Sequence, residues 1–257
     1  MARTARQKSE SGVYHVLLRG VDKLFLDSGD YTEFRARMKE YFAADVKLLA
    51  FLLLPNRVHL LIDAGENNLS VAVKPLCTSY ARYFNRTYSV DGKLFYDRFK
   101  SVPCHNNSDI ADTVAFLNAV GSKFTKSEHF SLAEYTSDAQ ICDTQRLTRL
   151  IGSAAESTNP VSLHLDDYTQ LSKEEMNIYL GIVASCTLED LANANRQEDS
   201  FKMIFSGGIS ARAILPLFGV HTKPTIKQKP AEKTSEEPQP QPQPKPAEKK
   251  NLSVWLL

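Results

Sequence analysis

Apolar positions between residues 12 and 128 alternate between the spacing of strands and the spacing of helices. The pattern predicts, in order, a strand (12–20), a helix capped by Asp30, a hairpin (46–54 and 58–63) across Pro55-Asn56, a helix (69–88), an extended segment (93–102) and a helix (109–123) capped by Ser108. This β-α-β-β-α-β-α order is typical of an α+β domain, and we expect a sheet with helices packed on one face.

The pattern changes twice after residue 128. Residues 129–200 are polar with short helical stretches and are expected to form a helical connector, whereas 201–227 show the spacing of a helix-turn-helix. Residues 228–257 are rich in Pro, Gln and Lys, which predicts an extended, solvated tail, and they end in the apolar peptide Asn251 to Leu257. Residues 1–11 are expected to be a flexible basic N-terminus.

Composition narrows the class of protein. The 257 residues carry a net charge of +1, so any basic surface must be local. The four cysteines match no paired zinc spacing and no dense disulfide frame, which favours a reducing cytoplasm. The longest apolar run, 48–55, is far shorter than the roughly 20 residues that span a bilayer, so we expect no membrane partner.

The most informative local pattern is Arg57-Val58-His59. Residues two apart on a strand face the same side, so Arg57 and His59 should project together from the sheet while Val58 enters the core. A lone His beside an Arg is more often structural than a metal ligand. The surrounding motifs favour the functional interpretation.

Several motifs, taken in order, resemble one family. They are Tyr14-His15-Val16 with Arg19-Gly20, Leu26-Asp27 with Asp30-Tyr31, the stretch 50–61, Tyr80-Ala81-Arg82-Tyr83-Phe84-Asn85-Arg86, and 92–95 with 98–101. Together they resemble the insertion-sequence-200-like single-tyrosine HUH transposases, most of all the REP-associated tyrosine transposases. The resemblance implies a ferredoxin-like sheet, a homodimer, and cleavage and rejoining of hairpin-bearing single-stranded DNA through a tyrosine. It also implies Mg²⁺ or Mn²⁺ bound by His-hydrophobe-His and a third ligand from a helix.

The chain departs from this pattern at the reacting groups. Arg57 stands where the family has its first histidine, and a guanidinium cannot coordinate a cation. His59 and Asn118 are the remaining metal ligands by resemblance, and the tyrosine position falls on Val114, or on Phe116 if the register slips. We therefore assign no catalytic residue, although Tyr80 or Tyr83 could supply a hydroxyl. Proline at 216 and 224 likewise breaks the helix-turn-helix pattern.

DNA binding has partly independent support. Residues 1–128 hold 18 Lys+Arg against 14 Asp+Glu, and basic residues alternate with aromatic ones, a combination suited to single strands or hairpins. A surplus of four charges is also common on ordinary surfaces. The residues expected to contact nucleic acid are His15, Arg19, Arg57, Tyr80, Arg82, Asn85, Arg86, Arg98 and Lys100.

Two functions therefore fit the sequence. The first is a transposase-family protein acting in DNA transposition with impaired or lost cleavage, and the second is a domesticated, non-catalytic DNA-binding protein. The terminal peptide 251–257 adds an interaction function, because it resembles short peptides that dock on the bacterial sliding clamp.

Overall fold

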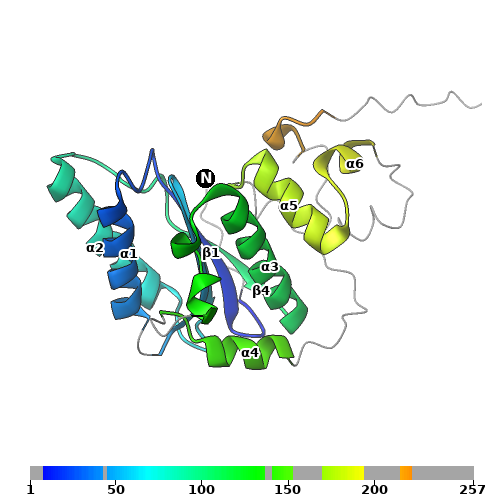
Figure 1. The fold of residues 1–257 in the computed structure, drawn as a ribbon, viewed down its shortest axis with the longest axis horizontal. Helices are drawn as coiled ribbons and strands as arrows, with labels where there is room; N and C mark the ends of the chain where they lie inside the picture. The colour runs from blue at the N-terminus through cyan, green and yellow to red at the C-terminus, as the bar shows by residue number, and fades with distance from the viewer. Residues whose placement is uncertain (1–7, 43–44, 137–140, 153–169, 194–214, 222–257) are drawn as a thin grey trace, which may run out of the picture. The chain divides into compact units, whose positions relative to one another are not determined.

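The computed structural model describes residues 8–42, 45–136, 141–152, 170–193 and 215–221 (Figure 1). The strands are β1 (Val13–Arg19), β2 (Lys47–Leu54), β3 (Arg57–Asp63) and β4 (Lys100–Cys104). The α-helices are α1 (Ser28–Tyr41), α2 (Ser70–Tyr88), α3 (Asn107–Phe124), α4 (Thr144–Gly152), α5 (Lys173–Ala184) and α6 (Leu188–Asn193). Short 3-10 helices are η1 (Ser127–His129), η2 (Ala133–Thr136) and η4 (Leu215–Phe218).

The four strands form one sheet in the order β2-β3-β1-β4, and every neighbouring pair is antiparallel. Strands β1 and β2 are therefore parallel and separated by β3, and β3 and β4 are parallel and separated by β1. Two interlocked split βαβ units of this kind make a ferredoxin-like arrangement. The α+β class and the ferredoxin-like topology predicted from the sequence are confirmed.

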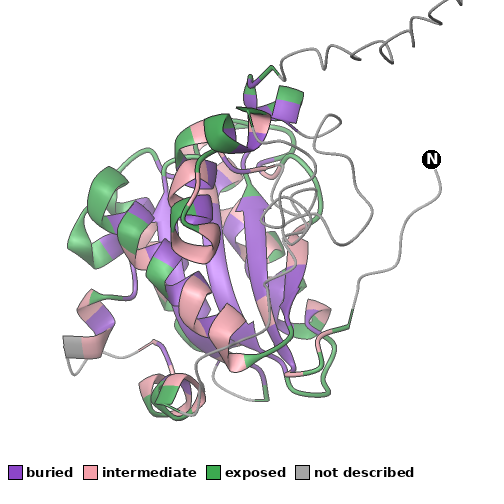
Figure 2. Ribbon diagram, turned by 90° about the vertical axis from the view of Figure 1, so that its right-hand side faces the viewer, coloured by how far each residue is buried: buried purple, intermediate pink, exposed green. Residues whose placement is uncertain are grey.

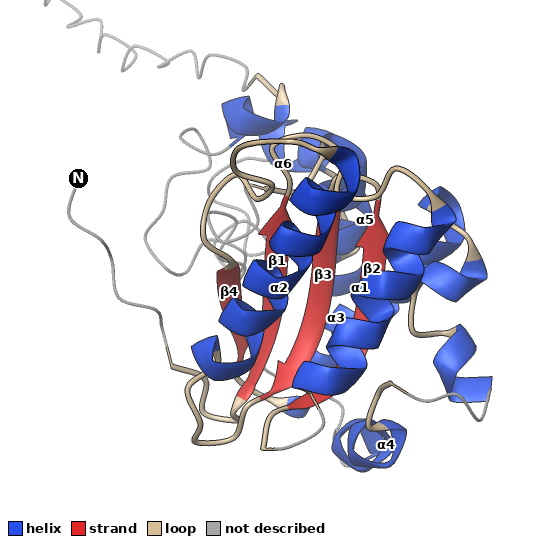
Figure 3. Ribbon diagram, turned by 90° about the vertical axis from the view of Figure 1, so that its left-hand side faces the viewer, coloured by secondary structure: helices blue, strands red, loops and turns tan. Residues whose placement is uncertain are grey.

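Helices α1 and α2 cover one face of the sheet (Figure 3). Alternate strand residues and the buried faces of both helices meet there in one apolar cluster, which includes Val16, Leu18, Phe51, Leu53, Val58, Leu60, Phe34, Met38, Val73, Leu76 and Tyr80. Tyr80 is fully buried, and its hydroxyl donates to the carbonyl oxygen of Leu24 at 2.7 Å. The helical spacing read from the sequence thus identifies the core side of α2.

Helix α3 covers the opposite face, so the expectation of helices on one face only was wrong. The remaining strand residues pack there against α3 in a second cluster, which includes Val13, Leu17, Leu52, Leu61, Val102, Ile110, Phe116, Leu117 and Val120. The reason is visible in β2, where every residue after Lys47 is buried. Strands that are apolar on both sides need cover on both faces, and Figure 2 shows the buried sheet between its helices.

Segments after residue 128 complete the second cluster. Helix α5 packs on α3 through Met176 and Tyr179, and η4 adds Leu215 and Phe218 to the same core. The described part of 129–200, expected to be only a connector, therefore belongs to the cover of the sheet. Most of the predicted helix-turn-helix (201–227) and the whole of 228–257 lie outside the described residues.

Helix starts follow ordinary capping chemistry, with two corrections to the expected caps. Asp27 is the N-cap of α1. Asp30, predicted to be the cap, is the third residue of the helix and forms a capping box with Asp27. Asn106, rather than Ser108, caps α3 by accepting from the amide of Asp109 at 2.9 Å. None of the helices in the described ranges combines the length and apolar character of a membrane span.

The outer edge of β2 is covered by the chain that follows α3. The amide of Ser131 donates to the carbonyl of Phe51 at 3.0 Å, and the amide of Asp143 donates to that of Leu48 at 2.8 Å. These bonds occupy backbone groups that an edge strand otherwise exposes.

Strand β4, at the other edge, is only five residues long. It contains Pro103, which has no amide hydrogen to donate. The carbonyl of Cys104 accepts from the hydroxyls of Ser9 and Ser11. This edge is therefore short and lacks one backbone donor.

Candidate functional site

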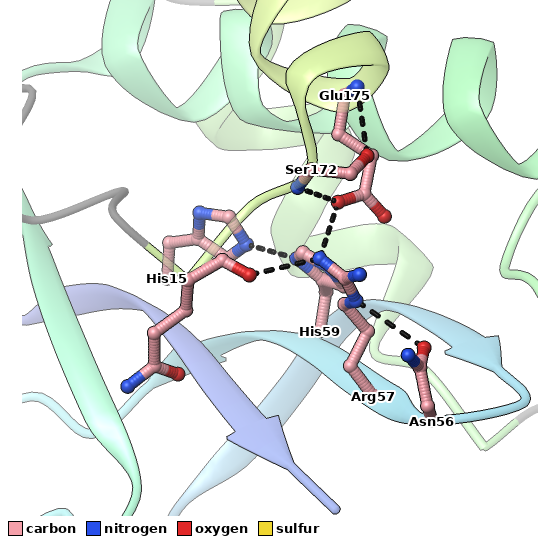
Figure 4. A network of polar contacts seen from close by, with 7 residues as sticks. His15, Asn56, Arg57, His59, Ser172 and Glu175 are labelled. Atoms are coloured by element: carbon pink, nitrogen blue, oxygen red, sulfur yellow. Dashed lines mark hydrogen bonds and ion pairs between the residues drawn. The ribbon is translucent and has the colours of Figure 1, made fainter. Parts of the chain in front are cut away.

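Strand β3 places Arg57 and His59 on the α3 side of the sheet, as the two-residue spacing predicted. His59 is fully buried, and its Nδ1 lies 3.1 Å from Nε2 of His15 on β1 (Figure 4). The two rings are stacked with centroids 5.3 Å apart and planes 27° apart. The sheet thus builds a buried histidine pair from neighbouring strands.

Both histidines are neutral at physiological pH. Burial lowers the pKa of His15 to about 3. Burial also lowers the pKa of His59 well below its ordinary value, and electrostatic repulsion from His15 and Arg57 adds to this effect. In a neutral pair one ring nitrogen donates and the other accepts, which suits the observed contact.

The α3 residue that faces this pair is Phe116. Its ring centroid lies 6.0 Å from that of His15 and 5.8 Å from that of His59, in edge contact with both. Phe116 also packs at 5.6 Å against Tyr179 of α5, and it is fully buried. Val114, where the family resemblance would put the nucleophile, is buried in the same core, and Phe116, the position reached if the register slips, is an aromatic ring without a hydroxyl.

Arg57 extends from β3 to the start of α5. Its Nη1 donates to Oε2 of Glu175 at 2.6 Å and to the carbonyl oxygen of Gln170 at 2.8 Å (Figure 4). The same Glu175 oxygen accepts from the amide of Ser172 at 2.7 Å, within the capping box that begins α5. No local pattern indicates this partner, because Glu175 lies 118 positions from Arg57 in a segment with no recognisable motif.

The divalent cation implied by the resemblance does not fit these residues. Arg57 has no lone pair to offer, and its charge is already neutralised by Glu175. Asn118 follows Phe116 by two residues on α3, and its buried Oδ1 makes no hydrogen bond within the described residues. No three His, Cys, Asp or Glu side chains of the described chain are placed to bind a metal. The prediction that His59 and Asn118 form one metal site stays a prediction.

Three residues predicted to contact nucleic acid are internal. His15 and Tyr80 are fully buried, and the Arg57 side chain is 18% exposed and occupied by its ion pair. Their residue types suggested DNA contacts, but the sheet and α2 direct them into the interior. Those three predictions were wrong.

The other predicted residues lie at or near the surface. Arg82, Arg86 and Arg98 are exposed, and so is Arg19, which lies over the Tyr96 ring at 4.9 Å. The half-buried residues of this set are Asn85 and Lys100. Arg82 and Arg86 are brought together on α2, whereas Arg98 belongs to the loop before β4.

The two α2 arginines line a groove between α1 and α2, on the sheet face away from the histidine pair. The groove has a volume of about 710 Å³ and is lined by Arg37, Tyr41, Lys74, Pro75, Thr78, Ser79, Arg82, Tyr83 and Arg86. None of these residues is acidic. Four cations and two tyrosine rings therefore face one cavity.

Sequence reasoning missed Lys74 and Arg37. Lys74, Thr78, Arg82 and Arg86 repeat every four residues, a spacing that places side chains along one stripe of a helix. That signal is readable in the sequence. The contribution of Arg37 depends on the packing of α1 against α2, because its Nε donates to the Ser79 hydroxyl at 2.9 Å.

Arg37 is fixed within the groove by its neighbours. Its guanidinium carbon lies 5.1 Å from the centroid of the Tyr83 ring, and its Nη1 pairs with Glu33 one turn earlier. No carboxylate of the described chain pairs with Lys74, Arg82 or Arg86. Their charges are available to an anionic ligand.

A second pocket adjoins the groove. It has a volume of about 460 Å³ and is lined by Leu18, Ser70, Lys74, Cys77, Thr78, Phe95, Asp97, Arg98 and Phe99. Lys74 and Thr78 line both cavities. The second pocket is mainly apolar, and Lys74 and Arg98 are among the residues that line it.

Solved structures similar to this chain include two transposases. No family profile and no curated protein sequence matches the chain. A REP-associated tyrosine transposase bound to a REP hairpin is similar at 13% identity and a TM-score of 0.43, over 55% of this chain and 90% of that one. A putative transposase from Deinococcus radiodurans R1 is similar at 14% identity and a TM-score of 0.32, over 49% of this chain and 100% of that one. Both neighbours are named as transposases.

Proposed function

We propose that this chain binds hairpin-bearing single-stranded DNA through the α1–α2 groove and does not cleave it. The observation that supports this most directly is the groove itself, where Arg37, Lys74, Arg82 and Arg86 converge without a lining carboxylate. Cations in a groove bind a phosphate backbone by releasing its counterions. Tyr83 offers a ring on which a base can stack.

The adjoining pocket extends this interface. Phe95 and Phe99 provide aromatic walls, and a cavity of about 460 Å³ is large enough for a nucleobase. Because Lys74 borders both cavities, a strand whose phosphates follow the groove can place an unpaired base in the pocket. An unpaired base is available in a single strand or in a hairpin with an extrahelical nucleotide.

The proposal that the chain does not cleave DNA rests on the residues of the other sheet face, which carries the histidine pair. Phosphotyrosine chemistry needs an accessible hydroxyl beside a cation, and the resemblance would put these groups at Val114 or Phe116 and at Arg57, none of which carries a hydroxyl or binds a cation. Tyr80 is no substitute, because burial raises its pKa and its hydroxyl is bonded to Leu24. Burial and the nearby Asp30 carboxylate also raise the pKa of Tyr83, which disfavours the phenolate nucleophile.

The test is binding of a fluorescent hairpin oligonucleotide, measured by anisotropy at several salt concentrations. We expect the double change Arg82→Ala and Arg86→Ala to weaken binding at least about tenfold at 0.15 M salt. The slope of log affinity against log salt should fall by about 1.5, since each lost phosphate contact removes about 0.7 to 0.9.

The matched control is Lys123→Ala with Lys126→Ala, which removes the same charge from exposed positions near the end of α3. Equal weakening by both pairs would mean that net charge, not the groove, governs binding. The same oligonucleotide carrying a cleavage site should give no protein–DNA adduct that resists boiling in detergent with Mn²⁺ present. Formation of such an adduct would refute the non-catalytic assignment.

A second function is proposed for the terminal peptide. Residues 251–257, which lie outside the described residues, resemble the short apolar peptides that dock on the sliding clamp. We propose that this peptide recruits the protein to replicating DNA, where single strands are exposed. Deleting 251–257 should abolish clamp binding in a pull-down while hairpin binding is retained, and unchanged clamp binding would refute the idea.

A further inference from the structure

The Arg57–Glu175 ion pair joins β3 to α5, which follows it by more than a hundred residues in the sequence. Its side chains are 18% and 5% exposed, so both charges have left most of their water. Arg57 makes two further contacts, to the carbonyl of Gln170 at 2.8 Å and to Oδ1 of Asn56 at 3.3 Å. The carboxylate is oriented by the Ser172 amide, so the charge on Glu175 is fixed by the first turn of α5.

The pair lies beside the one region where this class of fold would bind a cation. Residue 57 shares its side of β3 with the fully buried His59, and α5 contributes Tyr179 against Phe116 above it. A single positive charge is present there already, on a group that belongs to the chain. It is matched by a single negative charge from α5.

We propose that Arg57 is an internal cation that docks α5 on β3, so that this region is closed by the chain's own ion pair and takes no divalent metal. The inference is independent of DNA binding, because the groove lies on the other face of the sheet. Its physical basis is the cost of leaving one partner of a desolvated pair alone. Removing either charge leaves the other buried without a partner, which is strongly destabilising. Removing both charges leaves no unpaired charge.

The experiment compares hydrogen exchange of the α5 amides, 176–180, in the full chain and in three variants. In Arg57→Met and in Glu175→Gln we expect these amides to exchange about 100-fold faster than in the parent. In the double variant Arg57→Met, Glu175→Leu they should return to within about tenfold of the parent. Amides in the middle of α2, which does not touch the pair, should accelerate less than those of α5 in both single variants.

Equal acceleration of α5 and α2, or no acceleration of either, would overturn the docking role. Should Arg57→Met fail to fold, Glu175→Gln keeps the side-chain shape and carries the same expectation.

The proposal that this region takes no divalent metal is tested on the parent with MnCl₂ alone at millimolar concentration. A shift of the unfolding temperature below about 1 °C is expected, and a larger rise that disappears in His59→Gln would overturn it. Hairpin affinity should be unchanged in all three ion-pair variants.

Discussion

Lowering the pH should destabilise this protein through the His15–His59 pair. Both side chains are fully buried, and burial lowers the pKa of His15 to about 3 and that of His59 well below its ordinary value. In the unfolded chain each imidazole titrates near pH 6.5. Below that pH the unfolded state binds more protons than the folded state. The free energy of unfolding therefore decreases as the pH falls below about 6.5.

The size of the effect follows from linkage. Each histidine that protonates only on unfolding lowers the free energy of unfolding by about 2 kcal/mol between pH 7.5 and pH 5, and the pair by about 4 kcal/mol. With a urea dependence of about 2 kcal/mol per molar, the unfolding midpoint should fall by about 2 M. This loss is a large fraction of the 5 to 15 kcal/mol that stabilises a typical domain.

The assay is urea unfolding followed by circular dichroism at several pH values. His129, whose pKa burial also lowers, adds to the slope, so the parent is compared with the double variant His15→Leu, His59→Leu. Replacing both rings leaves neither without its partner, and the variant should lose about 4 kcal/mol less than the parent. Equal slopes in parent and double variant would refute the assignment of a neutral buried pair.

Three further changes test the packing. Gly121→Ala would place a methyl group 2.5 Å from the ring of Phe130, so we expect a loss of about 2 to 3 kcal/mol in the free energy of unfolding, measured by denaturant titration. Tyr80→Phe keeps the shape of the core but removes the donor to the Leu24 carbonyl, and a loss of about 1 to 2 kcal/mol with an unchanged circular dichroism spectrum is expected. Asp27→Ala removes the N-cap of α1 and should cost about 1 kcal/mol in the same titration; no loss would mean that the cap is replaced by solvent.

Local periodicity was sufficient to predict the order of strands and helices between residues 12 and 123, whereas the ferredoxin-like arrangement was implied by the family resemblance. The hairpin around Pro55-Asn56 and the helix over 70–88 need only neighbouring residues to be recognised, because turn chemistry and helical spacing are local. The same reasoning correctly placed Arg57 and His59 on one side of β3. It failed on the number of covered faces, since the apolar run of β2 fits a helix above, below or on both sides.

The candidate site was less predictable because its contacts are distant in sequence. Nothing near Glu175 indicates that it meets Arg57, and nothing near Phe116 indicates that its ring, rather than Asn118, covers the histidine pair. Residue type was also misleading, since His15 is as polar as a DNA-contacting residue yet lies in the core. The cation stripe of α2 was predictable in principle, as its four-residue repeat is a local pattern.

The covered edge of β2 and the short edge of β4, which contains Pro103, bear on how two copies of this chain can associate. Neither outer strand offers a long row of unpaired backbone groups as a template for a foreign strand. The homodimer expected from the family resemblance would therefore be joined by side chains on the helical surfaces, not by merging two sheets into one. Such an assembly would come apart through surface mutation while each protomer stayed intact.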